Sequence, residues 1–203
     1  MVMKKIFCFG DSNVYGYIPE SGKRYPKNIR WSGVLGQMTG KDYKIIEAGC
    51  NNRTAFSINP CGKFMSGSLI LPELLEPDFD IVILAVGVND LQFIYNVGRQ
   101  DFENGLERLV DIVKEGAPRA SVILLCPPVI GENILKSSFA SLFDRNSIEK
   151  SYHLKPIYET VAEKKSCKVL DLNEVVKSSD VDGLHFTQET HHQIAAFIYS
   201  SIE

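Results

Sequence analysis

The sequence has no long hydrophobic run. None of its apolar stretches reaches the roughly 18 residues that a membrane-spanning helix requires. Residues 1–10 hold two lysines and a short apolar stretch, but they have neither the long apolar core nor the small-residue cleavage site of a signal peptide. We therefore expect residues 5–9 to form a first strand, and we expect a cytoplasmic protein without membrane contacts.

Cysteine pairs and excess charge are also lacking. The chain has five cysteines, an odd number, and no Cys-x-x-Cys pair. We expect buried, reduced thiols in place of a disulfide framework or a zinc site, and we expect no metal and no organic cofactor. The formal net charge of −3 provides no strong attraction to nucleic acid or to an anionic membrane.

Three familiar binding and catalytic motifs are absent. No Gly-x-Gly-x-x-Gly fingerprint occurs, and the stretch 16–24 has the wrong spacing for a phosphate-binding loop, with Arg24 where Ser or Thr is needed. The Gly-x-Ser-x-Gly elbow of the α/β-hydrolases is missing because Val14 occupies the position of its second glycine. This difference separates the chain from the α/β-hydrolase fold.

The chain does contain short apolar runs that alternate with helical patterns. Residues 80–86 form a continuous aliphatic run, typical of a strand that is covered on both faces. Residues 101–114 carry apolar side chains three and four apart, which predicts an amphipathic helix with Asp101 as N-cap. The alternation predicts one α/β domain over residues 1–203, with a parallel sheet between helices. The expected strands are 5–9, 43–48, 80–86, 120–126 and 168–172, and the expected helices are 32–39, 101–114, 147–164 and 187–200.

Reactive residues occur at the ends of several of these elements. Ser12 directly follows the first strand, at the sheet edge where ligands bind in such folds and where free backbone N–H groups can face a negative charge. Asp182 and His185 are three residues apart, close enough for the carboxylate to orient an imidazole that takes a serine proton. Asn89 ends the third strand and can donate to an oxyanion. Each signal alone also fits an ordinary turn, but together they occur in the order that a serine hydrolase needs.

A fourth segment, residues 48–54, ends the second strand with a glycine-containing bend that can aim a backbone N–H at the same point. The irregular stretches 17–30 and 55–69 are expected to fold over this end of the sheet and to shape a pocket.

With these segments in view, the sequence resembles the SGNH (GDSL-type) hydrolase superfamily over nearly the whole chain. Within it, the chain most resembles the short arylesterase/acyltransferase-like branch, although residues 57–68 match that branch poorly. The residues that carry the resemblance are Gly10-Asp11-Ser12-Asn13-Val14-Tyr15-Gly16, Arg30-Trp31, Glu47-Ala48-Gly49, Asn52-Arg53-Thr54, Asp80-Ile81-Val82-Ile83, Gly87-Val88-Asn89-Asp90 and Asp182-Gly183-Leu184-His185.

The resemblance implies a three-layer α/β/α, flavodoxin-like fold with five parallel strands in the order 2-1-3-4-5. It implies Ser12 as nucleophile, His185 as base and Asp182 as the residue that orients the base. It also implies an oxyanion hole from the Ser12 backbone N–H, the Asn89 side chain and a backbone N–H of the second block. Alignment places that last donor on Asn52 or on Gly49, and we favour Asn52.

Further residues near these segments are candidate substrate contacts, and several have a plainer alternative. Trp31 could contact the substrate or pack in the core, and Arg53 could bind a substrate carboxylate or brace a loop. The candidates are Asp11, Asn13, Trp31, Gly49, Arg53 and Val88.

We expect the partner to be a small-molecule ester, and three functions remain open. The favoured one is a serine esterase that cleaves small acetyl, aryl or carbohydrate esters through an acyl-enzyme on Ser12. The others are a lysophospholipase or thioesterase of the same superfamily, and a flavodoxin-like binding module without catalysis. Relatives of the branch form dimers and rings, which implies a homo-oligomer with contacts around residues 93–97 and 139–143.

Overall fold

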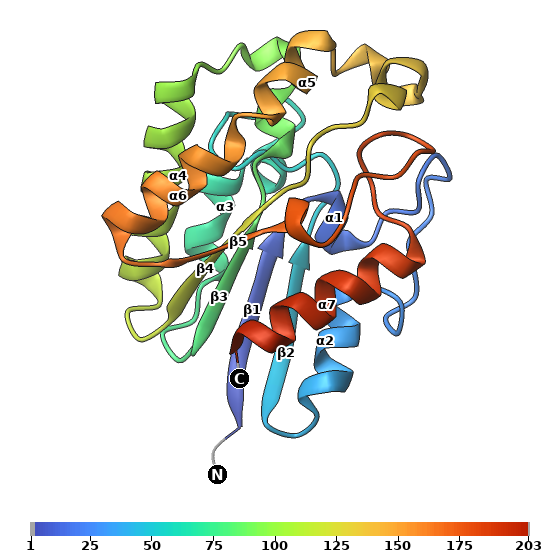
Figure 1. The fold of residues 1–203 in the computed structure, drawn as a ribbon. Coiled ribbons are helices and arrows are strands. Elements are labelled where there is room, and N and C mark those ends of the chain that lie inside the picture. Colours follow the sequence, from blue (N-terminus) through green and yellow to red (C-terminus); the bar gives the residue numbers. More distant parts are fainter. Residues whose placement is uncertain (1–2, 203) are drawn as a thin grey trace.

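The computed structural model describes residues 3–202, so the two ends of the expected 1–203 domain lie outside the described residues. Five parallel strands form one sheet in the order β2-β1-β3-β4-β5, and this confirms the predicted order (Figure 1). The strands are β1 (Lys4–Gly10), β2 (Tyr43–Gly49), β3 (Ile81–Ala85), β4 (Ser121–Cys126) and β5 (Lys168–Asp171).

Helices cover both faces of the sheet, as expected for buried parallel strands (Figure 1). Successive residues of β1 point to opposite faces: Phe7 and Phe9 join one core cluster, and Ile6 and Cys8 join the other. The first cluster includes residues of α3, α4 and α6, and the second includes residues of α2 and α7. These helices are α2 (Trp31–Thr39), α3 (Gly67–Leu74), α4 (Arg99–Gly116), α6 (Leu154–Lys165) and α7 (Gln188–Ile202).

Two helix predictions were wrong in detail. The expected helix 147–164 consists of α5 (Arg145–Ser151) and α6, because the Pro156 ring would clash with the Tyr152 carbonyl in one continuous helix. Helix α4 begins before Asp101, so Gly98 is its N-cap and Asp101 lies in the first turn. The sequence patterns also missed α1 (Ser12–Tyr15) and α3. The 3₁₀ helices are η1 (Lys63–Met65), η2 (Val88–Leu91), η3 (Phe93–Tyr95), η4 (Glu132–Lys136), η5 (Ser138–Ser141) and η6 (Leu172–Glu174).

The carboxyl ends of β1, β2 and β3 meet in register, and this creates the floor of a site. Gly10 at the end of β1 pairs with Gly49 of β2 and Ala85 of β3. A Cβ atom on Gly49 would lie 2.2 Å from the Tyr15 backbone nitrogen, so only glycine allows α1 to pack directly onto the strand ends. This contact places Ser12 at the edge of the sheet.

The five cysteines carry no disulfide, and their burial differs from the expectation. Cys8 and Cys126 are buried, whereas Cys50 and Cys167 are half-buried and Cys61 is exposed in the irregular stretch after β2. The prediction of buried thiols therefore fails for Cys61, because it lies between Pro60 and Gly62 in an irregular segment that leaves its side chain in solvent.

Candidate active site

Ser12 is the first residue of α1, the single turn that follows β1. The Asp11 carboxylate accepts a hydrogen bond from the Asn13 N–H at 2.9 Å, and this bond fixes the turn. Among residues 3–202, no acceptor bonds the Ser12 N–H. The Ser12 hydroxyl and its own N–H are thus available at the start of a helix, where the backbone donors point outward.

Ser12, His185 and Asp182 form one buried chain of hydrogen bonds. The Ser12 Oγ lies 2.9 Å from His185 Nε2, and His185 Nδ1 lies 2.8 Å from Asp182 Oδ2. The three residues are 5%, 2% and 0% exposed, respectively. Sequence spacing suggested this convergence, and the structure contains the contacts that it requires.

The Asp182 carboxylate is held in place by its own turn. Its Oδ1 accepts the backbone N–H groups of Leu184 and His185 at 3.0 and 2.9 Å. Burial opposes ionisation, but the hydrogen bonds from His185 and the turn outweigh it and lower the pKa of Asp182 below its ordinary value. An ionised carboxylate requires a proton on His185 Nδ1, which leaves Nε2 free to accept the serine proton.

Two asparagines from different strand ends face the same cavity as Ser12. Asn89 lies in η2 after β3, and its Nδ2 donates to the Arg53 carbonyl at 3.0 Å, which leaves a second N–H on the same nitrogen. Asn52 has a left-handed backbone with φ of 60°, and within the described residues its N–H has no acceptor. Together with the Ser12 N–H, these groups give the cavity lining three N–H donors, an arrangement that can bind a negatively charged oxygen.

The cavity beside Ser12 has a volume of about 210 Å³. This is below the roughly 300–1,000 Å³ of most ligand pockets. The rings of Tyr17 and Phe139 lie against His185, with centroid distances of 4.3 and 5.0 Å. The residues that line the cavity are Ser12, Tyr17, Asn51, Asn52, Asn89, Phe139, Leu142, Phe143, Leu184 and His185.

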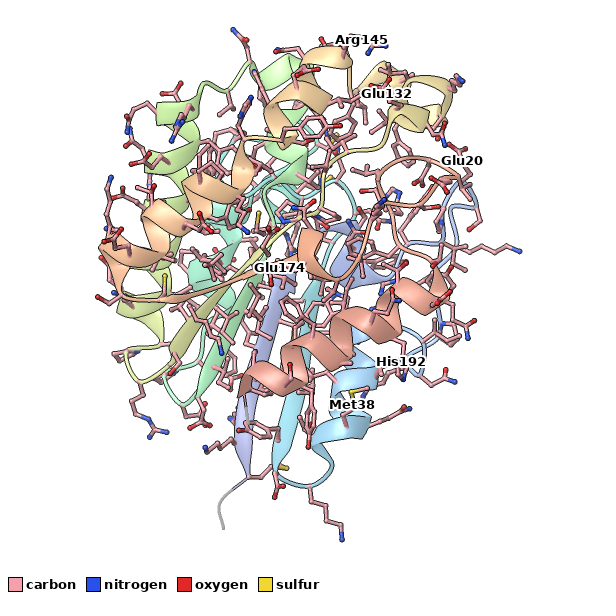
Figure 2. The ribbon with its side chains drawn as sticks, viewed as in Figure 1. Glu20, Met38, Glu132, Arg145, Glu174 and His192 are labelled. Carbon is pink, nitrogen blue, oxygen red and sulfur yellow. The ribbon has the colours of Figure 1, made fainter. Side chains whose placement is uncertain are left out.

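Two long connections contribute to the lining of this cavity, the stretch after α1 through Tyr17 and the connection from β4 to α5 through Phe139; no residue of the stretch 55–69, which was expected to shape the pocket, lines it. Glu20, in the stretch between α1 and α2, accepts a hydrogen bond from the Ser138 N–H at 2.9 Å, and this ties it to η5. Figure 2 shows Glu20 at the same end of the molecule as Glu132 and Arg145. Asp90 accepts the N–H groups of Ala55, Phe56 and Ser57 and so anchors the start of the stretch 55–69.

The six candidate substrate contacts lie outside the residues that line this cavity. Arg53 is buried, and its guanidinium donates to the carbonyls of Gly10, Ala48 and Phe64, so it braces three segments. Val88 and Gly49 belong to the packed strand ends. The remaining three candidates line a separate space of about 20 Å³ on the other side of the α1 turn; they are Asp11, Asn13 and Trp31.

Asp11 has an unusual ionisation. Burial raises its pKa to about 7, although the Asn13 N–H and the Arg53 charge favour the ionised form. Asp90 is also buried, and its pKa is raised by loss of solvation despite three backbone hydrogen bonds. Both carboxyl groups accept hydrogen bonds from backbone N–H groups, and neither residue lines the Ser12 cavity.

Sequence reasoning missed the residues that shape the walls of the cavity. Tyr17, Phe139, Leu142 and Phe143 lie on irregular segments, and no periodic pattern signals which of their side chains turn inward. Gln92, after η2, is buried and contacts both asparagines. Its position three residues after Asn89 was the one feature of the sequence that could have indicated its place beside the site.

Within the described part of the chain, no group of three or more His, Cys, Asp or Glu residues is arranged to hold a metal ion. Among the same residues, no helix combines the length and the apolar character needed to cross a membrane.

The fold has the three α/β/α layers and the parallel strand order of flavodoxin-like SGNH hydrolases, which are distinct from the α/β-hydrolase fold. The model of the GDSL-like lipase/acylhydrolase family matches residues 8–193, and the chain belongs to this family. This confirms the resemblance seen in the sequence and makes the protein a carboxylic ester hydrolase of the SGNH type.

Solved structures with the same fold include two esterases. An aryl esterase from M. smegmatis is 28% identical, with a TM-score of 0.91, and the match covers 98% of each chain. A carbohydrate acetylesterase from Sinorhizobium meliloti is 27% identical, with a TM-score of 0.92 and the same coverage of both chains. A comparison with curated proteins found no match.

Proposed function

We propose that this protein is a serine esterase that hydrolyses small acyl esters through an acyl-enzyme on Ser12. The observation that carries the proposal is the 2.9 Å contact between Ser12 Oγ and His185 Nε2, with Asp182 behind the imidazole. Such a contact lets the imidazole take the hydroxyl proton as the oxygen attacks a carbonyl carbon.

The reaction proceeds in two halves. In the first, Ser12 Oγ bonds to the carbonyl carbon, its proton moves to His185 Nε2, and the ester oxygen leaves with that proton as the alcohol. In the second, water gives a proton to Nε2 and attacks the acyl carbon, and the Ser12 oxygen recovers its proton as the acid departs. The N–H groups of Ser12 and Asn52 and the Asn89 side chain hold the oxyanion in both halves.

The small, aromatic-walled cavity supports a short acyl group, with an acetyl ester of an aryl or carbohydrate alcohol as the favoured substrate. The names of the aryl esterase and the carbohydrate acetylesterase agree with this choice. A lysophospholipase or thioesterase would need room for a long chain, which a cavity of about 210 Å³ does not offer. A binding module without catalysis would have no need for the buried Ser–His–Asp chain.

We also propose that residues 1–203 form a single esterase domain that acts in the cytoplasm without cofactor, nucleic acid or membrane. The homo-oligomer proposal rests on Phe93 and Ile94, which are 48% and 62% exposed side by side in η3. The second suggested contact region, residues 139–143, contributes instead to the cavity wall through Phe139, Leu142 and Phe143.

Hydrolysis of p-nitrophenyl acetate by the wild type and by Ser12→Ala tests the proposal. We expect turnover by the wild type and loss of at least about 10³-fold in kcat in the variant. Equal activity of the two proteins, or an inactive wild type, would contradict the esterase proposal and favour a binding module without catalysis. A series of acyl lengths on aryl, sugar and glycerol alcohols then separates the short-chain esterase from the lysophospholipase or thioesterase.

A further inference from the structure

Gln92 joins two loops that come from different strands. Its side chain is 3% exposed, and its Nε2 donates to Asn52 Oδ1 at 2.7 Å and to Asn89 Oδ1 at 3.1 Å. A carboxamide nitrogen has two hydrogens, so these two bonds use both of them. One side chain therefore fixes Asn52, in the loop after β2, and Asn89, in η2 after β3, relative to each other.

The hydrogen bond from Gln92 determines how the Asn89 carboxamide is oriented, with its oxygen toward Gln92 and its nitrogen toward the Arg53 carbonyl. Because Oδ1 accepts from Gln92, Nδ2 turns toward the Arg53 carbonyl and keeps one hydrogen that has no acceptor among residues 3–202. A rotation of the amide by half a turn would set two carbonyl oxygens against each other. It would also present an acceptor to the developing oxyanion, and this would repel the charge.

Asn52 is held on two sides. Gln92 binds its Oδ1, and the Asn59 Nδ2 donates to its backbone carbonyl at 2.8 Å. These bonds fix Asn52 in a left-handed conformation that asparagine adopts more readily than other non-glycine residues.

We propose that Gln92 is a positioning residue that aligns two of the three oxyanion donors, Asn52 and Asn89. This inference rests on the proposed esterase function. Gln92 does not line the cavity and touches no reacting atom, so it acts through the two asparagines. Its loss weakens binding of the transition state more than binding of the ester.

The test compares Gln92→Met and Gln92→Glu with the wild type on p-nitrophenyl acetate. Both replacements keep the length of the side chain and remove the two donated hydrogen bonds. We expect kcat to fall roughly 10- to 100-fold with KM changed less than about threefold, because removal of one oxyanion donor costs about 10²–10³-fold. The inhibition constant of phenylboronate, which forms a tetrahedral adduct on a serine, should rise by a similar factor.

Gln100→Met is the matched control, because Gln100 is exposed on α4 and its side chain donates to Asn104 on the same helix. Thermal unfolding shows whether each Gln92 variant is folded. If one of the two does not fold, the kinetics of the other test the inference. In an Asn89→Ala background, Gln92→Met should cost clearly less than in the wild type, whereas general damage to the fold would cost the same in both.

Two results would overturn the inference, and they differ from each other. Folded Gln92 variants with wild-type kcat and wild-type phenylboronate affinity would remove the role of Gln92 and leave the esterase intact. A wild type without Ser12-dependent ester hydrolysis would remove both.

Discussion

The imidazole of His185 lies 2.9 Å from the hydroxyl of Ser12 although 173 positions separate them in the chain. The serine comes from the first strand end and the histidine from the turn before α7. Neither the Gly10-to-Asn13 segment nor the Asp182-to-His185 segment is reactive by itself, so the proposed chemistry depends on how firmly the fold holds this distance.

The Asp182 carboxylate should matter for turnover far more than for substrate binding. Asp182→Asn keeps the size of the side chain but no longer requires a proton on His185 Nδ1, so the imidazole can adopt the wrong tautomer. We expect kcat to fall roughly 10³- to 10⁴-fold with little change in KM. Steady-state kinetics on p-nitrophenyl acetate measures both constants. Retention of more than a tenth of the activity would exclude Asp182 from this role.

Phe139 should limit the length of the acyl group. Its ring lies 5.0 Å from the His185 ring and forms part of the wall of the cavity. Phe139→Ala should raise kcat/KM for p-nitrophenyl hexanoate relative to the acetate by about tenfold, because space for additional methylenes is worth about 1–3 kcal/mol. Leu135→Ala, a nearby change outside the cavity lining, is the control. An unchanged preference in both variants would place the acyl group elsewhere.

Arg53 should act as a brace and not as a substrate ligand. Its guanidinium donates to the carbonyls of Gly10 and Ala48 from Nη1 and to the Phe64 carbonyl from Nε. Arg53→Lys cannot reach all three carbonyls, so we expect a loss of roughly 2 kcal/mol in the free energy of unfolding. The ratio of kcat/KM for p-nitrophenyl acetate to that for mono-p-nitrophenyl succinate should stay constant. A selective loss on the anionic ester would instead support carboxylate binding by Arg53.

His191 should make the fold sensitive to acid. It is fully buried in α7, its Nδ1 accepts the Trp31 N–H at 3.3 Å, and burial lowers its pKa to about 4. The folded state binds this proton less readily than the unfolded state, whose ordinary value is 6.5. The contribution of neutral His191 to the free energy of unfolding is therefore complete above pH 6.5. As the pH falls from 6.5 to 4, the free energy of unfolding decreases by roughly 3 kcal/mol.

Urea unfolding of wild type and His191→Asn across this pH range measures the effect. An asparagine oxygen can still accept the Trp31 N–H, but it does not titrate, so the variant should lose less stability between pH 6.5 and 4. His192→Asn is the control, because His192 is exposed on the same helix, α7 (Figure 2). Parallel pH profiles for the wild type and His191→Asn would contradict the assignment.

The strands followed from the sequence because each is a short apolar run, whereas their order in the sheet was expected only from the resemblance to the SGNH hydrolases. The Ser12, Asp182 and His185 positions could also be predicted, since each occurs at an element end that parallel sheets bring together. Helix ends were less predictable. The break before α6 arises from a steric clash at Pro156, which an apolar periodicity does not register.

The sequence by itself determined the α/β class and which residues carry reactive groups, because these follow from local periodicity and residue chemistry; the sheet order was implied by the family resemblance. Only the tertiary structure decided which side chains line the cavity and which support it. Arg53 points back to three carbonyls, while Tyr17 and Phe139 turn toward His185. These directions are set by packing between loops far apart in the chain, and no local pattern records that packing.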